Sequence, residues 1–184
     1  MAAFIDLVNF LTTNGLASTP HKGRTYLGHS TRVYICMKGW GCADHSCDAA
    51  FFQSVYGTQI WQRKTLPIEQ RSVLIDLIGE KAERLVFASC FMDRESFYEQ
   101  LHDNKKTFSL EHRNKGERIT LTRHQFDELA TIQLADFLQE YLFVNGSLLR
   151  NTPVEALAKR ASRGGLNALR CIMLEGYAQT LWAA

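Results

Sequence analysis

Polar side chains interrupt the apolar faces of predicted helices at three places in the chain. These are His29, the adjacent pair Gln53 and Ser54, and Asp136. A buried polar group costs free energy unless it finds a partner, a metal or a ligand, so these positions are the first candidates for chemistry. An imidazole exchanges protons near neutral pH, a carboxylate can orient it, and an amide or hydroxyl can bind a ligand. Each position also has a structural alternative, in which the side chain caps a neighbouring helix or makes a satisfied hydrogen bond in the core.

Three helices must position these side chains. Apolar residues at helical spacing predict a helix over about 25–38, which carries the histidine in its first turns. A helix over 44–56 is ended by a glycine and holds the glutamine and serine in its last turn. Thr122 and Gln125 form a capping box, and the helix behind it extends over about 123–143 and carries the aspartate.

The remaining pattern predicts a mostly α fold, with a single helical domain over residues 1–184. One small β-hairpin is predicted at about 108–122, where apolar and polar side chains alternate on both sides of a turn signal, Asn114-Lys115-Gly116. The other helices are predicted from Phe4 to the stop at Asn14-Gly15, from Pro67 to Ile78, from Glu80 to Met92, and on either side of Gly164-Gly165, the last one reaching Trp182.

Size, composition and charge exclude several classes of protein. The chain has 184 residues, of which 46% are hydrophobic and 22% charged, as is typical of a folded domain that needs no disulfides. A formal net charge of +2 gives no field on the scale of a nucleic-acid-binding protein. The N-terminus lacks the basic region of a secretory signal, and no run approaches the roughly 20 apolar residues of a membrane span. We therefore expect a cytoplasmic protein that binds neither nucleic acid nor membrane.

The five cysteines argue against a disulfide framework, because their number is odd and their spacing irregular. Cys42 and Cys47 flank His45, but the chain has no CxxC and no second pair. Small buried side chains are therefore favoured over a zinc knuckle. Apolar faces on the first and last helices leave a homodimer open.

The order of the polar positions resembles that of the HD superfamily, a group of all-helical, metal-dependent phosphohydrolases. Its motif runs His, then His-Asp at the end of a later helix, then a distant Asp. In the hydrolase domains that degrade the stringent-response alarmone, the paired segment has the form Ala-Ala-Leu-Leu-His-Asp-Val. The chain has Ala49-Ala50-Phe51-Phe52-Gln53-Ser54-Val55, with His29 before it and Leu134-Ala135-Asp136-Phe137-Leu138 after it.

An uncharacterised bacterial HD-like family, a domain of unknown function, is more similar still. Its members carry Pro-His-Ser-Gly-Arg-Thr, a following His, Trp-Gly, Phe-His-Ser-x-Tyr-Gly-Thr and Ile-Gly-Glu-x-Ala-Glu-x-Leu-Val. The chain has Pro20-His21-Lys22-Gly23-Arg24-Thr25, His29, Trp40-Gly41, Phe52-Gln53-Ser54-Val55-Tyr56-Gly57-Thr58 and Ile78 to Val86. This resemblance covers residues from about 15 to 145, and it implies a fold but no reaction.

The chain departs from the HD superfamily at the paired ligands. Gln53 stands in place of the histidine and Ser54 in place of the aspartate, so only His29 and Asp136 remain of the four ligands that the resemblance implies. Two protein ligands rarely hold a catalytic divalent ion. The acidic pair of the alarmone hydrolases is replaced by Tyr56-Gly57, which removes the carboxylates that would serve as general base. The resemblance thus implies the scaffold without ordinary phosphohydrolase activity.

Three functions remain open. The first is an HD-like enzyme with a degenerate, metal-poor pocket and no cofactor, which performs acid–base chemistry on a small organic or anionic substrate in a bacterial metabolic or biosynthetic pathway. Its catalytic residues would be His29, His21, Asp136 and Tyr56, and its substrate-binding residues Gln53, Ser54, Arg24 and Thr58. The second is a catalytically silent HD-like module that binds a ligand or a protein partner. The third holds a divalent transition metal through His21, His29 and Asp136 and acts as a hydrolase or oxygenase.

Overall fold

The computed structural model of the chain describes residues 2–21, 23–63, 66–141 and 153–171. Within them the chain is mostly α-helical, which confirms the predicted fold class. The named helices are α1 (Phe4–Thr13), α2 (Tyr26–Gly39), α3 (Asp44–Phe51), α4 (Arg71–Phe91), α5 (Arg94–Glu99), α6 (Arg123–Tyr141) and α7 (Val154–Arg160). Short 3₁₀ turns, Ile68–Gln70 and Gln100–His102, precede α4 and follow α5, and residues 163–171 are also helical.

Two small antiparallel hairpins accompany the helices. The predicted hairpin is present as β3 (Thr107–Glu111) and β4 (Arg118–Thr122), whose alternate side chains are buried. The second hairpin was not predicted, and it pairs β1 (Pro20–His21) with β2 (Arg24–Thr25) in the loop before α2. Glycine is required at the turn between them, because Gly23 has φ +79°. This turn directs the end of β1 back over the start of α2.

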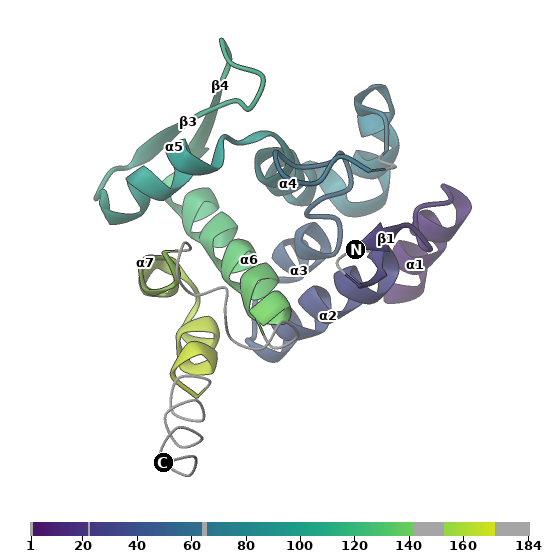
Figure 1. Cartoon of the computed structure of the whole chain (residues 1–184), viewed down its shortest axis with the longest axis horizontal. Helices are drawn as coiled ribbons and strands as arrows, with labels where there is room; N and C mark the ends of the chain where they lie inside the picture. The colour runs from purple at the N-terminus through teal and green to yellow at the C-terminus, as the bar shows by residue number, and fades with distance from the viewer. Residues whose placement is uncertain (1, 22, 64–65, 142–152, 172–184) are drawn as a thin grey trace.

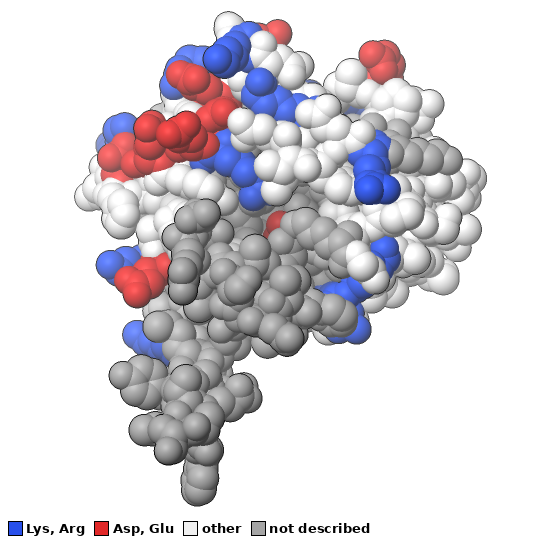
Figure 2. Space-filling model, in the orientation of Figure 1, with Lys and Arg blue, Asp and Glu red and all other residues white. Residues whose placement is uncertain are grey.

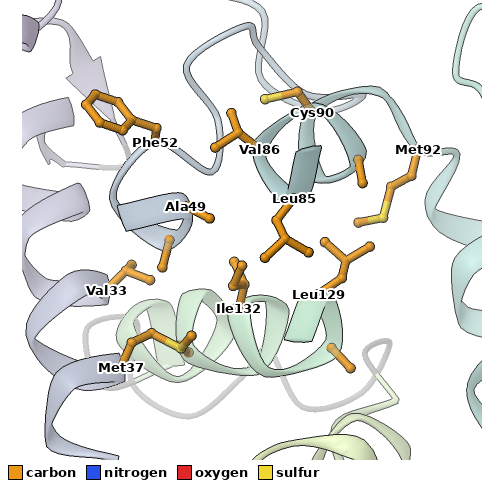
Figure 3. Packing of buried hydrophobic residues seen from close by; sticks show 14 of the residues in the cluster. Val33, Met37, Ala49, Phe52, Leu85, Val86, Cys90, Met92, Leu129 and Ile132 are labelled. Carbon is orange, nitrogen blue, oxygen red and sulfur yellow. The ribbon is translucent and has the colours of Figure 1, made fainter. Parts of the chain in front are cut away.

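The core forms around α6, which packs against α2, α3, α4 and α7 (Figure 1). Figure 3 shows side chains from four of these helices pointing toward one another: Val33, Met37, Ala49, Leu85, Val86, Leu129 and Ile132. Burial of each large aliphatic side chain contributes about 1.5–3 kcal/mol, so this contact fixes how the helices sit around the centre. The polar positions of α2 and α6 are held by the same packing.

Local capping explains where α2 and α6 begin. The Thr25 hydroxyl accepts a hydrogen bond from the Gly28 backbone N–H at 3.1 Å, and this starts α2 one residue later. At α6, the Gln125 side chain accepts from the Thr122 backbone N–H at 2.9 Å, while the Thr122 hydroxyl accepts from the Gln125 backbone. The predicted capping box is therefore confirmed. The predicted end of this helix, near residue 143, lies outside the described residues.

The segment after α3 differs from the prediction. The helix ends at Phe51 rather than continuing to Tyr56, so Gln53 and Ser54 lie in a run of turns after the helix. Residues 51–58 are all buried. If residues 51–58 continued the helix, their buried side chains would point in all directions and would need packing partners on every face of it. Successive turns instead let consecutive side chains point into one interior region. Gly57, with φ +75°, ends this run.

Two glycine positions predicted as helix breaks have different outcomes. Gly79 leaves the helical region with φ +81° and ψ +156°, and it kinks α4 between two helical halves. Gly164 and Gly165 instead lie in the first turn of the helix over 163–171, and the break between the two predicted helices falls earlier, at residues 161–162. A Cβ at Gly164 would come within 2.6 Å of the Trp40 backbone. These glycines therefore allow two segments to approach closely, and their type is explained by packing.

The surface carries both signs of charge. Figure 2 shows lysine and arginine side chains next to aspartate and glutamate side chains over α5 and the β3–β4 hairpin. Among the described residues, no helix combines the length and apolar character needed to cross a membrane.

Candidate functional site

The three polar positions of the sequence converge at one buried point. His29 comes from α2, Gln53 from the turns after α3, and Asp136 from α6, and all three residues are buried. The Gln53 amide nitrogen lies 3.0 Å from His29 Nε2 and 3.1 Å from Asp136 Oδ1. His29 Nε2 lies 2.9 Å from the same Oδ1. We call this group the polar triad, because each member contacts the other two.

Two contacts of the triad meet at the Asp136 carboxylate. The Gln53 amide donates to Asp136, and an imidazole that carries its proton on Nε2 donates to the same carboxylate oxygen. A carboxylate in this position orients the ring and stabilises the imidazolium ion that forms when histidine takes up a proton. Burial strengthens this interaction, because little water screens the two side chains.

His21 lies directly over the triad. The turn between β1 and β2 brings its ring onto the His29 ring, with centroids 4.3 Å apart and an interplanar angle of 30°. The edge of Trp61 contacts His21 at 4.8 Å, and Trp61 stacks on Tyr26 at 5.3 Å. The loop-borne histidine is thus fixed between aromatic rings and is itself buried.

A small cavity of about 10 Å³ adjoins the triad. It is lined by His21, Gln53, Ser54, Thr58, Ile60, Trp61, Arg94 and Asp136. This is about the volume occupied by a single water molecule. The indole Nε1 of Trp61 is buried and has no hydrogen-bond acceptor among the described residues. One of the residues around this space therefore carries a buried donor without an acceptor among the described residues.

Ser54 and Thr58 also border the small cavity, and each has a local role. The Thr58 hydroxyl accepts from the Trp61 backbone N–H at 3.1 Å, which holds the turn that carries the indole. Ser54 lies with Ser30 beside the Tyr26 hydroxyl. Burial, with a smaller contribution from Cys90, raises the pKa of Tyr26, and the two serines partly offset that rise. Tyr26 therefore stays neutral at physiological pH.

Tyr56 and Arg24 do not line the small cavity. The Tyr56 hydroxyl donates to Glu83 at 3.1 Å, and the fully buried Glu83 carboxylate also accepts from Arg71 at 2.5 and 2.7 Å. Arg24, on β2, is half-buried, and its pKa is lowered by burial and by the neighbouring Arg32. The structure thus brings together the predicted site residues other than these two, and it places Tyr56 in a separate ion-pair network.

Three residues that line the small cavity, namely Ile60, Trp61 and Arg94, were not among the predicted site residues. One signal was present for Trp61, since a single large aromatic residue stands in the polar stretch Gly57-Thr58-Gln59-Ile60-Trp61-Gln62-Arg63. The Glu83 and Arg71 pair was not predicted either, because their separation of three helical turns spans the kink in α4.

The remaining prediction to compare with the structure is metal binding by the predicted site residues or by the Cys42 and Cys47 segment. Within the described stretches, no group of three or more His, Cys, Asp or Glu side chains is arranged to hold a metal ion. The cysteines of the suspected knuckle are free thiols: Cys42 contacts the Ser162 hydroxyl at 3.6 Å, and Cys47 donates to the Cys42 carbonyl. Burial raises the pKa of Cys47 to about 12, which keeps this thiol protonated.

Comparison with known proteins identifies similarity in the N-terminal half only. No curated protein matches the chain, and no solved structure matches it. The segment that contains His21, His29, Gln53 and Ser54 is similar to a known family, whereas Asp136 lies beyond the matched region. Residues 10–94 match a protein family described as a domain of unknown function (DUF6817).

Proposed function

We propose that the protein is a small-molecule enzyme in which His29, oriented by Asp136, serves as the general acid or base. The observation that carries this proposal is the buried contact between the His29 imidazole and the Asp136 carboxylate. Asp136 and His21, which both contact His29, line the small cavity, although the His29 ring itself does not. General acid–base catalysis needs a titrating group near neutral pH within reach of the substrate, and histidine meets the first requirement without a cofactor. His21, stacked on His29, is the second candidate for proton exchange.

The substrate presents an oxygen atom to the small cavity. The space fits one oxygen, and the Trp61 indole and the Ser54 hydroxyl border it as donors. Arg94 also lines the cavity, and a guanidinium favours an anionic group such as a carboxylate or phosphate ester. A small organic acid whose carbonyl or carboxylate oxygen enters the cavity satisfies these groups.

The resemblance to the HD superfamily forms part of this proposal. His29 and Asp136 are the two positions that the resemblance assigns to a metal site, and here they contact each other at 2.9 Å. The Gln53 amide stands in the position of a third ligand and donates to the carboxylate. The proposed enzyme therefore uses an inherited scaffold, with hydrogen bonds in place of metal coordination.

One observation favours a second candidate, the catalytically silent binding module. The small cavity has room for about one water molecule, and the Asp136 carboxylate already accepts from both His29 and Gln53. In this alternative the triad is a structural polar core, and the protein acts through its surface.

Ligand screening with matched variants separates these candidates. We would screen small hydroxy and keto acids and phosphate esters by thermal shift, using the wild type, Trp61→Phe, His29→Gln and the exposed-histidine control His102→Gln. The enzyme proposal expects a stabilising acid whose affinity falls at least about tenfold in Trp61→Phe, since one hydrogen bond to an anion is lost. It expects turnover to disappear in His29→Gln and to persist in His102→Gln. Equal ligand affinities in all four proteins would show that the small cavity is not the ligand-binding site.

Metal analysis of untagged protein tests the third function. Stoichiometric iron, manganese or zinc that is lost on His29→Ala would contradict the metal-free mechanism. It would support a metal site at His21, His29 and Asp136.

A further inference from the structure

A second and larger cavity lies where the junction of α2 and α3 meets α6 and α7. Its volume is about 240 Å³. An engineered protein cavity of about 150 Å³ holds benzene, so the large cavity has room for a molecule with one ring. Its lining includes Met37, Ala43, Ser46, Glu128, Thr131 and Ala161. Apolar side chains and a few convergent polar groups are the usual composition of a small-molecule site.

The main polar group of the large cavity is the Glu128 carboxylate. His45 Nε2 lies 2.5 Å from its Oε1, and the buried Ser46 hydroxyl donates to the same oxygen at 2.7 Å. His124, one turn earlier on α6, contacts Oε2 through Nδ1 at 2.9 Å. A carboxylate has about four acceptor positions, and described residues use three of them. Glu128 therefore keeps acceptor capacity for one more donor.

When the His45 and His124 imidazoles are neutral, the charges around the large cavity sum to an excess of negative charge. Asp127 pairs with Arg160 at 2.9 Å, so these two charges offset each other. Arg160 also donates to the backbone carbonyls of Leu101 and Asp103, and it stacks over the Phe126 ring. Because its guanidinium is committed to the scaffold, the Glu128 carboxylate determines the sign of charge that a ligand meets when the imidazoles are neutral.

We propose that the large cavity binds a small organic cation, specifically a primary amine attached to an apolar body about the size of one aromatic ring. The apolar body packs against Met37 and Ala161, and the ammonium group donates to Glu128. This site is separate from the polar triad and shares no lining residue with the small cavity. The proposal does not depend on the enzyme function proposed above.

Three ligands of equal shape and different charge test this proposal. Benzylamine, benzyl alcohol and benzoate are titrated at pH 8, above the ordinary imidazole pKa, with binding measured by calorimetry. Benzylamine should bind at least tenfold more tightly than benzyl alcohol, and benzoate should bind more weakly than the alcohol. Amide NMR shifts of the wild type provide a readout that needs no variant, and they should move at Ser46, Thr131 and Ala161.

Two variants and a control then assign the contacts. Glu128→Gln should remove the tenfold advantage of benzylamine while benzyl alcohol still binds, and Ala161→Leu should weaken both by at least tenfold by filling the space. Glu155→Gln, which removes an exposed carboxylate on α7, should change neither. The proposal is overturned if benzylamine does not bind at millimolar concentration, if benzoate binds as well, or if the wild-type shifts map away from the cavity.

Discussion

The small and the large cavity use the same kinds of groups in different amounts of space. At the polar triad an imidazole, a carboxylate and an amide lie within 3.1 Å of one another, and the small cavity of about 10 Å³ adjoins the carboxylate and the amide. In the large cavity one carboxylate contacts two imidazoles, and about 240 Å³ adjoins it. Polar groups that satisfy each other in a filled interior stabilise the fold whatever else they do. Polar groups beside an empty space keep capacity for a ligand.

The largest effect is expected where the triad loses its charged member. Asp136→Ala leaves His29 and Gln53 buried without their acceptor, which costs about 2–4 kcal/mol of unfolding free energy. Asp136→Asn keeps the shape and one acceptor oxygen, so its cost should be about half as large. Urea unfolding at pH 7.5 measures both. A loss below about 0.5 kcal/mol for the alanine variant would mean that the triad does not stabilise the fold.

Alkaline titration tests the surroundings of the small cavity. Burial raises the pKa of Tyr26 above its ordinary value of 10.0. Above pH 10 the unfolded chain loses this proton and the native protein keeps it, so stability is full below pH 10 and falls as the pH rises. The slope is about 1.4 kcal/mol per pH unit for each such tyrosine. Tyr26→Phe should unfold with a flatter dependence between pH 10 and 11, as measured by urea unfolding, and an unchanged slope would contradict the assignment.

The large cavity should tolerate the loss of its carboxylate better. Glu128→Ala removes the acceptor of the buried Ser46 hydroxyl and of His45, which is half-buried, at a cost of about 1–2 kcal/mol. The comparison of the two cavities would fail if this variant were as unstable as Asp136→Ala in the same urea series.

Substitution of His124, the exposed partner of Glu128, should have a smaller effect on the free energy of unfolding. The His124 side chain is 73% exposed and pairs with Glu128 four residues later on α6. Exposed pairs of this kind contribute about 0.5 kcal/mol or less, so His124→Ala should lie within that range. A larger loss would indicate that His124 belongs to the buried part of the site.

Chemical labelling of the cysteine thiols has the smallest effect on the protein, because it reports the access of a reagent to each thiol without changing the stability of the fold. Cys171 is exposed, whereas burial raises the pKa of Cys42 and of Cys47. Iodoacetamide at pH 8 should therefore modify Cys171 first and Cys42 at least about tenfold more slowly, since the thiolate is the reactive form. Mass spectrometry of timed samples measures the order. Rapid labelling of Cys47 would show that the interior near the large cavity opens.

Sequence patterns predicted the helical class and the residues of the triad, because both depend on local features. The period of apolar residues predicts helices, and at His29 and Asp136 the sequence itself places a polar residue on an apolar face. The capping box at Thr122 was predicted for the same reason, since its two members are three residues apart. The HD-like relation and the functional roles stay predictions.

The rest depends on contacts between distant segments, which no local pattern encodes. Gly164 was predicted as a helix break because glycine often ends helices, yet its type is set by the approach of Trp40, far away in the sequence. The end of α3 was predicted too late because residues 51–58 are buried on every side. The large cavity was missed because it joins the α2–α3 junction to α7, and its lining residues look ordinary in each segment.

The kink in α4 gives the ion pair of Glu83 a mechanical role. Arg71 lies before Gly79 and Glu83 lies after it, so their contact connects the two halves of the helix across the bend. Tyr56 joins the same carboxylate, which ties the turns that carry Gln53 to both halves of the helix. Rotation of either half would separate the buried Glu83 carboxylate from the partly exposed Arg71 guanidinium. A single carboxylate outside both cavities therefore links the two halves of one helix to the turns that carry the triad amide.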